Sequence, residues 1–323
     1  MMQIRPFSIE DLSAVVALWN REATKYDYKP FTERDFQDTF INHSYFDAEC
    51  MWVGCNEQGI AGFAAGCSGD DLPLGDVAGY ITTVIMDPGA ASLELYDAFL
   101  LRMETRFRQL GKSQAEVLFF NPVKLKWNIP GAPQHEHNNA PGISKDQPLY
   151  EALIARGYAD RATQCGMYLK LGNFSVPEDI ASKEDKANSK GYQVTHYAPA
   201  VHKGLESMLA ALQNPQWETD VAAYVKDGEP LVVAVHDSKV VGFAGPIMVE
   251  PDGRAFFCGI GVRPEYEGYG LGSVLFFRMV EAFQNAGCQY ISLFTGSNNP
   301  ALRIYQKAGF HVEKQFSILR REL

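Results

Sequence analysis

The sequence predicts an α+β fold made of two tandem copies of one unit, each with a mixed, mostly antiparallel sheet flanked by helices. Three observations predict it. The chain has 323 residues, too many for one typical domain and enough for two. Its second half alternates short strand-like runs with amphipathic helical runs, which is typical of a layered α+β domain. Segments of the first half also recur in the second half in the same order.

The best of these repeats aligns residues 86–111 with residues 262–287 without a gap. Both segments run from a strand through a proline and a loop into a helix that carries Arg-Met and ends at glycine. Two further pairs share a Gly-Phe-Ala strand or a helix ending in glycine and an aromatic residue: 59–66 with 239–246, and 148–158 with 300–310. Three matches in one order indicate an internal duplication.

The elements of the second copy follow from periodicity and turn residues. Strands are predicted where apolar and β-branched residues run between turn signals, at 191–197, 230–237, 239–250, 254–262, 288–296 and 310–323. Helices are predicted where apolar residues recur at helical spacing, at 200–212, 218–228, from about Ser273 to 287, and at 298–309. Asp237 and Ser238 form the turn of a hairpin.

The segment 172–190 is polar, rich in charge and poor in large apolar residues, and it is predicted to be a linker. The first copy then occupies residues 1–171 and the second copy residues 191–323. The first copy carries an insertion at 121–147, rich in Pro, Gly and Asn, between its strand and its last helix. Loops of this length are usually functional or disordered.

Composition limits the class of function. A net charge of −10 argues against a nucleic-acid-binding surface, which needs a basic patch. No run approaches the roughly 20 apolar residues of a membrane span, so no membrane partner is expected. The N-terminus lacks the features of a signal peptide, so a cytoplasmic location is expected. The six cysteines form no CxxC pair and are predicted to be reduced, and the oligomeric state stays open.

Three alternate glycines, Gly268, Gly270 and Gly272, stand directly before a strongly helical run. A helix N-terminus leaves N–H groups unpaired and carries a partial positive charge, which suits phosphate oxygens. Glycine removes the Cβ atoms that would hold a phosphate away. The spacing alone is a weak signal, because it lacks the dinucleotide-binding fingerprint and a flexible turn explains it equally well.

The surrounding residues resemble the GCN5-related N-acetyltransferase (GNAT) family. That family has R/Q-x-x-G-x-G/A at a strand-to-helix junction, then an asparagine before a helix carrying a tyrosine, then Gly-Phe. Here these are "EGYGLG" at 267–272, Asn298, Tyr305 and Gly309–Phe310, in the family's order. The resemblance extends over the second copy and combines several motifs, which makes it more specific than the glycines alone.

The resemblance implies direct transfer of an acetyl group from acetyl-CoA, a co-substrate, to the primary amine of a small molecule or peptide in a ternary complex, without a metal. Tyr305 would protonate the departing thiolate, because a phenol and an alkyl thiol have similar pKa values. Asn298 would brace the cofactor, and Gly261 and Val262 would pair with pantetheine through their backbone. The pyrophosphate would be held by the segment Glu267, Gly268, Tyr269, Gly270, Leu271, Gly272 and Ser273.

One residue departs from the family pattern: Glu267 replaces the usual Arg or Gln. A carboxylate close to a pyrophosphate is repulsive by about 1 kcal/mol in water. Glu267 is therefore expected either to turn into solvent or to weaken coenzyme A binding.

A general base is also required but is not assigned by the sequence. The polar residues near the strand are Cys258, Glu250, Asp252 and Glu265, whereas His236 and His311 are expected to be structural. A non-catalytic acyl-CoA-binding protein, a sensor or regulator, is the alternative.

In the gap-free alignment, the three glycines fall opposite Ser92, Glu94 and Tyr96. Counting back from the Gly-aromatic pair that ends each last helix, Tyr305 falls opposite Leu153. The first copy is therefore predicted to be degenerate and not to bind acetyl-CoA. Trp127 and the histidines of 135–137 are expected to form a lid over the second copy's site. A metal is not expected at this His-x-His, because no third ligand accompanies it.

Overall fold

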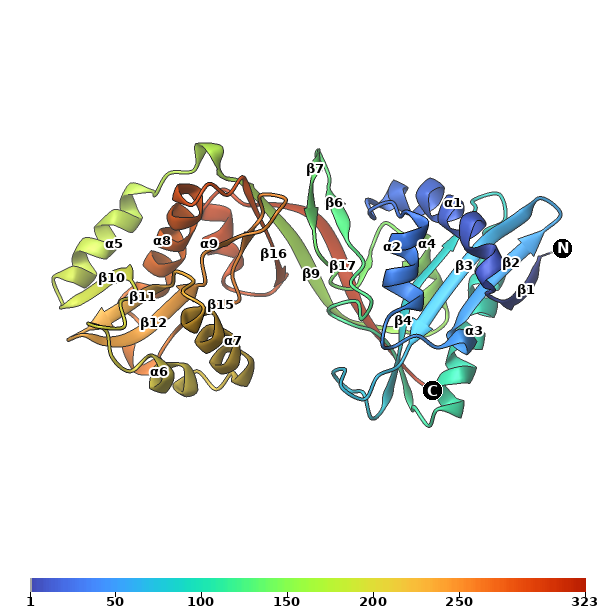
Figure 1. The fold of residues 1–323 in the computed structure, drawn as a ribbon, viewed down its shortest axis with the longest axis horizontal. Helices are drawn as coiled ribbons and strands as arrows, with labels where there is room; N and C mark the ends of the chain where they lie inside the picture. Colours follow the sequence, from blue (N-terminus) through green and yellow to red (C-terminus); the bar gives the residue numbers. More distant parts are fainter. Residues whose placement is uncertain (1) are drawn as a thin grey trace. The chain divides into compact units, whose positions relative to one another are not determined.

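The computed structural model describes residues 2–323, and their chain folds into two compact units (Figure 1). The first unit runs up to Met167 and also contains Leu293–Asn299 and Val312–Leu323. The second unit consists of Tyr168–Ser292 and Pro300–His311. The chain thus passes from one unit to the other more than once.

The first unit is built on a mixed sheet with the strand order β1-β2-β3-β4-β5-β17-β9-β16, in which β8 also pairs with β17. The pair β4–β5 is parallel, whereas β1–β2, β2–β3, β3–β4 and β5–β17 are antiparallel. The strands are β1 (Gln3–Pro6), β2 (Met51–Asn56), β3 (Gly59–Cys67), β4 (Ala78–Met86), β5 (Gln114–Val117), β8 (Ile143–Ser144), β9 (Ala159–Lys170), β16 (Tyr290–Gly296) and β17 (His311–Glu322). The helices are α1 (Leu12–Glu22), α2 (Glu33–Phe36), α3 (Leu93–Gln109) and α4 (Pro148–Ala155).

The second unit has a four-stranded antiparallel sheet in the order β10-β11-β12-β15, and a small hairpin. The strands are β10 (Tyr192–His196), β11 (Val232–His236), β12 (Lys239–Gly245), β13 (Met248–Val249), β14 (Ala255–Phe256) and β15 (Gly259–Val262). The helices are α5 (Glu178–Asn188), α6 (Leu205–Ala211), α7 (Pro215–Lys226), α8 (Leu271–Asn285) and α9 (Leu302–Lys307). The turn between β11 and β12 is formed by Asp237 and Ser238, with φ angles of 49° and 62°, which suit a primed hairpin turn.

The repeated Gly-Phe-Ala tripeptide has the same position in both units. Gly62 of β3 pairs with Met86, and Gly242 of β12 pairs with Val262, each at the end of the strand that precedes the long helix. A Cβ atom on either glycine would lie 3.0–3.1 Å from a side chain of that helix, α3 or α8. In both copies, the phenylalanine that follows this glycine points to the opposite face of the sheet, because side chains alternate along a strand. This equivalence, together with the mixed sheet of the first unit and the antiparallel sheet of the second, confirms the predicted fold class of two tandem α+β copies.

The last strand of the chain belongs to the first unit. In β17, Leu319 pairs with Val117 of β5, so the end of the second copy completes the sheet of the first. The observed units therefore differ from the predicted division into 1–171, a linker and 191–323. The difference has a physical reason: local periodicity specifies that a strand forms, but the choice of partner depends on contacts distant in sequence.

A buried carboxylate reinforces this arrangement. Glu104 of α3 is 0% exposed and accepts hydrogen bonds from Arg156, Tyr158 and Arg321, the last on β17. Burial opposes its charge, but hydrogen bonds and charge from the two arginines outweigh burial and lower the pKa of the Glu104 carboxyl.

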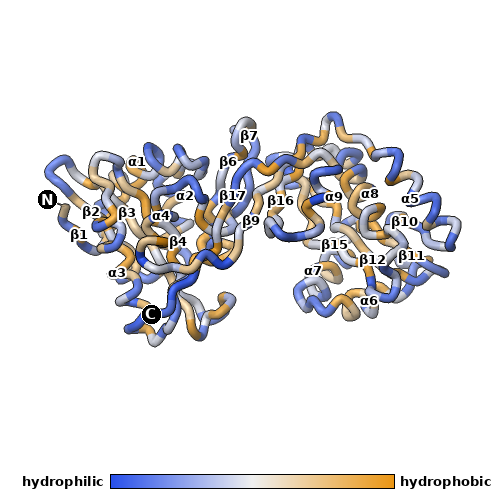
Figure 2. The backbone as a smooth tube through the Cα atoms, turned by 180° about the vertical axis from the view of Figure 1, so that it is seen from behind, coloured by the Kyte–Doolittle hydropathy of each residue, from blue (hydrophilic) through white to orange (hydrophobic). Residues whose placement is uncertain are grey.

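The predicted linker is largely helical. Helix α5 occupies most of 172–190 and buries Ile180 and Ala187 within the second unit. Its sequence is otherwise hydrophilic, as Figure 2 shows by the blue colour of much of α5. This helix was not predicted from the sequence, because only two apolar residues, seven positions apart, define its buried face.

The insertion at 121–147 is also ordered. It contains the hairpin of β6 (Trp127–Ile129) and β7 (Ala132–His137), as well as β8. Trp127 is 1% exposed, donates a hydrogen bond from Nε1 to the carbonyl of Asn139 at 3.0 Å, and packs against Phe316 and Phe294 of the first unit. His135 and His137 are buried as well. The expectation of a lid was wrong, because these side chains are part of the first unit's core.

Among residues 2–323, no helix is both long and apolar enough to cross a membrane. In the same part of the chain, no group of three or more His, Cys, Asp or Glu side chains is placed to hold a metal ion. All six cysteines are unpaired, and four of them are buried.

Candidate functional site

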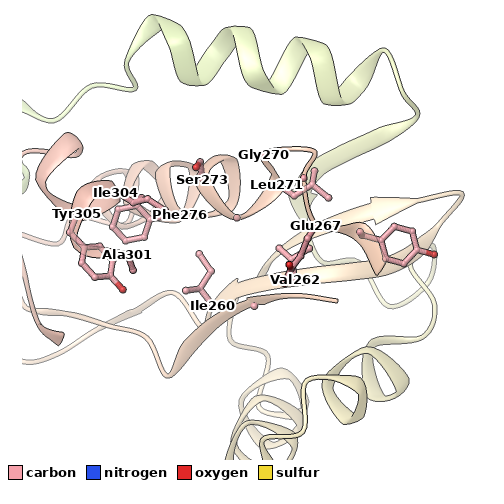
Figure 3. A pocket seen from close by; sticks show the side chains of 14 residues that line it. Ile260, Val262, Glu267, Gly270, Leu271, Ser273, Phe276, Ala301, Ile304 and Tyr305 are labelled. Carbon is pink, nitrogen blue, oxygen red and sulfur yellow. The ribbon is translucent and has the colours of Figure 1, made fainter. Parts of the chain in front are cut away.

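A pocket of about 360 Å³ lies within the second unit, between β15, the first turns of α8, and α9 (Figure 3). Most of the residues that line it were predicted from the sequence to be site residues. The lining residues are Ile260, Gly261, Val262, Tyr266, Glu267, Gly268, Gly270, Leu271, Gly272, Ser273, Phe276, Ala301, Ile304 and Tyr305.

Two of the three glycines are required by the backbone. Gly268 and Gly270 have φ angles of 83° and 76°, a left-handed conformation that costs other residues roughly 1–2 kcal/mol. Gly272 lies in α8, where φ does not demand glycine. A Cβ atom there would meet no atom closer than Cγ2 of Val262 at 4.0 Å. The absent side chain of Gly272 therefore leaves space on the pocket side of the helix.

Helix α8 begins at Leu271, two residues earlier than predicted, with Gly270 as its N-cap and no side-chain cap. Within residues 2–323, none of the six consecutive amides from Gly268 to Ser273 donates to a protein acceptor. The first amide of the helix that does so is that of Val274, which donates to the carbonyl of Gly270 at 3.2 Å. A run of free N–H groups at a helix N-terminus is a binding site for anions, phosphate above all.

The strand side of the pocket offers further backbone groups. Strand β15 is the last in its sheet, so one of its edges carries no neighbouring strand. The amide of Arg263 donates to Val241 of β12 at 2.9 Å. By strand alternation, Gly261 also faces β12, while Ile260 and Val262 direct their backbone groups to the open edge. All three residues line the pocket, but only Val262 and Ile260 present their backbone groups at the open edge. Ile260 was not singled out from the sequence, because its orientation depends on the strand pairing.

Tyr305 lies on α9 at the end of the pocket formed with Ala301 and Ile304. Its ring packs against Phe276 and Phe310, with centroid distances of 5.1 and 5.9 Å. In Figure 3 the ring of Tyr305 lies next to Phe276. Burial raises the pKa of the Tyr305 hydroxyl, so at neutral pH this group is protonated and can donate a hydrogen.

Two predicted site residues are placed outside the pocket lining. The side chain of Tyr269 is 45% exposed, and its ring centroid lies 4.7 Å from that of Tyr192. Asn298 is exposed in the turn after β16 and belongs to the first unit. Glu267 does line the pocket and is exposed to solvent.

The three carboxylates considered as bases all have partners within the protein. Glu250 pairs with Arg254, Asp252 accepts a hydrogen bond from the hydroxyl of Tyr290 on β16, and Glu265 pairs with Arg263. The remaining candidate is a thiol: burial raises the pKa of Cys258 to about 12, so it does not form a thiolate at neutral pH. His236 packs against Tyr192, as expected of a structural residue.

The equivalent turn of the first copy satisfies its own amides. The side chain of Asp87 accepts a hydrogen bond from the amide of Gly89 at 2.9 Å, and its backbone carbonyl accepts from the amides of Ala90 and Ala91 at 2.9 and 3.0 Å. The hydroxyl of Ser92 then caps α3 by accepting from the amide of Leu95 at 3.2 Å. Acceptors of the protein itself thus satisfy amides of this turn. This supports the prediction that the first copy is degenerate.

Comparison with known proteins agrees with this geometry. Residues 199–310 match the family model of the acetyltransferase (GNAT) family. No curated protein matches the chain in sequence. Among solved structures, the chain is similar to a GCN5-related N-acetyltransferase from Sphaerobacter thermophilus, with 16% identity, a TM-score of 0.62, and coverage of 99% of this chain and 95% of that one.

Two other solved structures have the same fold. A tandem GNAT protein from the clavulanic acid biosynthesis pathway is 13% identical with a TM-score of 0.56, over 100% of this chain and 98% of that one. A glucosamine N-acetyltransferase region of a fungal multi-domain β-N-acetylglucosaminidase is 16% identical with a TM-score of 0.62, over 99% of this chain. This chain spans 38% of the length of that fungal protein.

The family match covers residues 199–310, which include the glycine loop and Tyr305. Over the rest of the chain, the similarity to these solved structures shows that the chain has their fold.

Proposed function

We propose that this protein is an N-acetyltransferase that moves an acetyl group from acetyl-CoA to a primary amine, with its active site in the pocket of the second unit. One observation carries the proposal: six consecutive unpaired amides, from Gly268 to Ser273, open onto a pocket that also contains Tyr305. A scaffold needs neither the free amides nor a tyrosine hydroxyl in the pocket.

Coenzyme A would lie along the pocket with its diphosphate at the glycine loop, its pantetheine arm beside β15 and its thioester near Tyr305. The diphosphate would lie on the amides of the glycine loop, where the helix dipole favours negative charge. The pantetheine arm, which contains two amide groups, would pair with the backbone of Ile260 and Val262 at the open edge of β15. The thioester would then reach the end of the pocket near Tyr305.

The chemical step is a direct transfer within a ternary complex. The neutral amine nitrogen attacks the carbonyl carbon of the thioester, and a C–N bond forms as the C–S bond breaks. The sulfur leaves as a thiolate and takes the proton of the Tyr305 hydroxyl, which recovers a proton from solvent. The amine loses its proton to water, because the carboxylates considered as bases are engaged by other groups of the protein.

The acceptor is a primary amine on a small molecule or a peptide. An acidic protein attracts cationic molecules over long range, and the net charge of −10 therefore favours amines that are protonated in solution. Such steering acts on the rate of encounter more than on the affinity.

The experiment is to measure release of free thiol from acetyl-CoA with a panel of primary amines, comparing the wild type with Tyr305→Phe. The proposal predicts amine-dependent release by the wild type and a large loss in the variant, with coenzyme A binding retained. A second candidate is an acyl-CoA sensor without turnover, favoured by the exposed Glu267 on the pocket wall, which opposes a bound diphosphate, and by the engagement of Glu250, Asp252 and Glu265 with other protein groups. Tight coenzyme A binding without thiol release for any amine would establish the sensor instead.

A further inference from the structure

A lysine of helix α5 lies over the glycine loop. If Gly270 carried a Cβ atom, its three nearest neighbours would be Cδ, Cβ and Cγ of Lys183, at 3.7, 3.8 and 3.9 Å. The aliphatic stem of Lys183 therefore runs along the loop whose amides are unpaired. Both residues belong to the second unit, so this contact lies within one compact body.

Two ion pairs hold α5 in this position. Glu184 accepts hydrogen bonds from Arg278 of α8, with an Nε–Oε2 distance of 3.0 Å, and Asp179 pairs with Lys307 of α9. The pKa of the Asp179 carboxyl is lowered mainly by its hydrogen bond from Lys307, and the charge of Lys183 lowers it further. These pairs attach α5 to the two helices that border the pocket.

Lys183 itself is exposed, and among residues 2–323 no carboxylate lies within 4 Å of its ammonium group. Its stem is positioned by the loop while its charge is free to turn toward a ligand. A lysine side chain of this kind commonly lays its methylene groups on the protein and keeps the ammonium in water.

Lys183 supplies a positive charge beside a loop that lacks the one expected from the family pattern. The family pattern begins with Arg or Gln, but this chain has Glu267 at that position, on the wall of the pocket. A carboxylate there opposes the charge of a diphosphate. A cation on the other side of the same loop offsets that repulsion, and lysine binds phosphate as a point charge without needing a fixed orientation.

We propose that Lys183 binds the phosphates of the acyl carrier and replaces the charge missing at Glu267, so that the site selects phosphorylated carriers, such as coenzyme A, over pantetheine alone. This inference rests on the proposed function. It assigns a ligand-binding role to a segment outside the family match, which begins at residue 199.

The test is isothermal titration of coenzyme A and of pantetheine, which lacks phosphates, into the wild type and two variants. Lys183→Gln removes the charge and keeps a good helix former, so α5 is retained. Lys226→Gln is the matched control, because it removes the same charge from the same unit at a separate pocket between α6 and α7. Circular dichroism and thermal melting establish that each variant folds.

The proposal predicts that Lys183→Gln weakens coenzyme A binding roughly threefold to tenfold, the range of a partly screened charge pair, and leaves pantetheine binding unchanged. Lys226→Gln should leave both unchanged. The difference should shrink at about 0.5 M salt, because an exposed charge is screened.

Equal coenzyme A affinities for Lys183→Gln and the wild type would overturn the inference while leaving the proposed function intact. Equal losses in both lysine variants would overturn it too, because the effect would then come from overall charge. If the wild type binds no coenzyme A, the proposed function fails and this inference fails with it.

Discussion

Two substitutions of Gly272, by alanine and by leucine, separate folding from ligand binding at the glycine loop. Gly272 is the second residue of α8, and a Cβ atom there would approach the protein no closer than 4.0 Å, at Val262. The backbone accepts alanine without strain, and alanine is the better helix former by about 0.5–1 kcal/mol. For a domain of this size, that gain should raise Tm by roughly 1–4 °C in the absence of ligand.

A larger side chain at the same position should harm binding. The family pattern allows alanine here, so Gly272→Ala should keep coenzyme A binding, whereas the side chain of Gly272→Leu projects into the space that a phosphate must enter to reach the amides of Leu271 to Ser273. A hydrogen bond to a charged group contributes about 1.5–3 kcal/mol, and each 1.4 kcal/mol is a factor of ten in affinity. Losing even one such bond should therefore weaken coenzyme A binding by at least about tenfold.

The assay is thermal melting of Gly272→Ala and Gly272→Leu with and without coenzyme A, alongside Gly287→Ala as a control. Gly287 ends the same helix with a φ of 86° and faces open space, so alanine there should lower Tm and leave the ligand-induced shift unchanged. If Gly272→Leu keeps the full ligand-induced shift, phosphate does not approach these amides and the reasoning is refuted. A lower Tm of Gly272→Ala without ligand would contradict the account of the helix start.

Four further outcomes are expected. Tyr305→Phe should lower the rate of thiol release about a hundredfold or more while the Kd for coenzyme A stays the same, because only the proton donor is lost; an unchanged rate would remove Tyr305 from the chemistry. In a pH series, the rate should not fall on the alkaline side below about pH 10, since burial raises the pKa of Tyr305 and the donor stays protonated. Glu267→Gln should tighten coenzyme A binding up to about fivefold at low salt by titration calorimetry, because a repulsion of about 1 kcal/mol is removed; weaker binding would contradict this. Glu104→Gln should lower the unfolding free energy by about 3 kcal/mol in urea titration, because Arg156 and Arg321 lose their shared buried partner; a loss below about 1 kcal/mol would show that this network is not important.

The sequence alone allowed the glycine loop to be located, because its signal is local. Gly268 and Gly270 stand directly before a helix, and both adopt the left-handed conformation that favours glycine. The matching strands were also predictable, since the repeated Gly-Phe-Ala has the same register in both copies. The features that were predicted correctly are those that depend on residues close together in the chain.

The errors concern contacts between distant residues. The placement of β17 beside β5 depends on partners about two hundred residues apart, which no local pattern encodes. Trp127 was read as part of a lid because polar residues surround it in sequence, but in space it packs against Phe294 and Phe316. Lys183 escaped notice for a similar reason: only the packing of α5 brings it to the glycine loop.

The most direct test of the central claim is a crystal structure of the protein with coenzyme A. The account predicts the diphosphate within about 2.7–3.2 Å of backbone amides between Gly268 and Ser273, with the sulfur at the Tyr305 end of the pocket. A coenzyme A molecule bound at the turn of Asp87 to Ser92 in the first unit, with the amides of the glycine loop left to solvent, would contradict it.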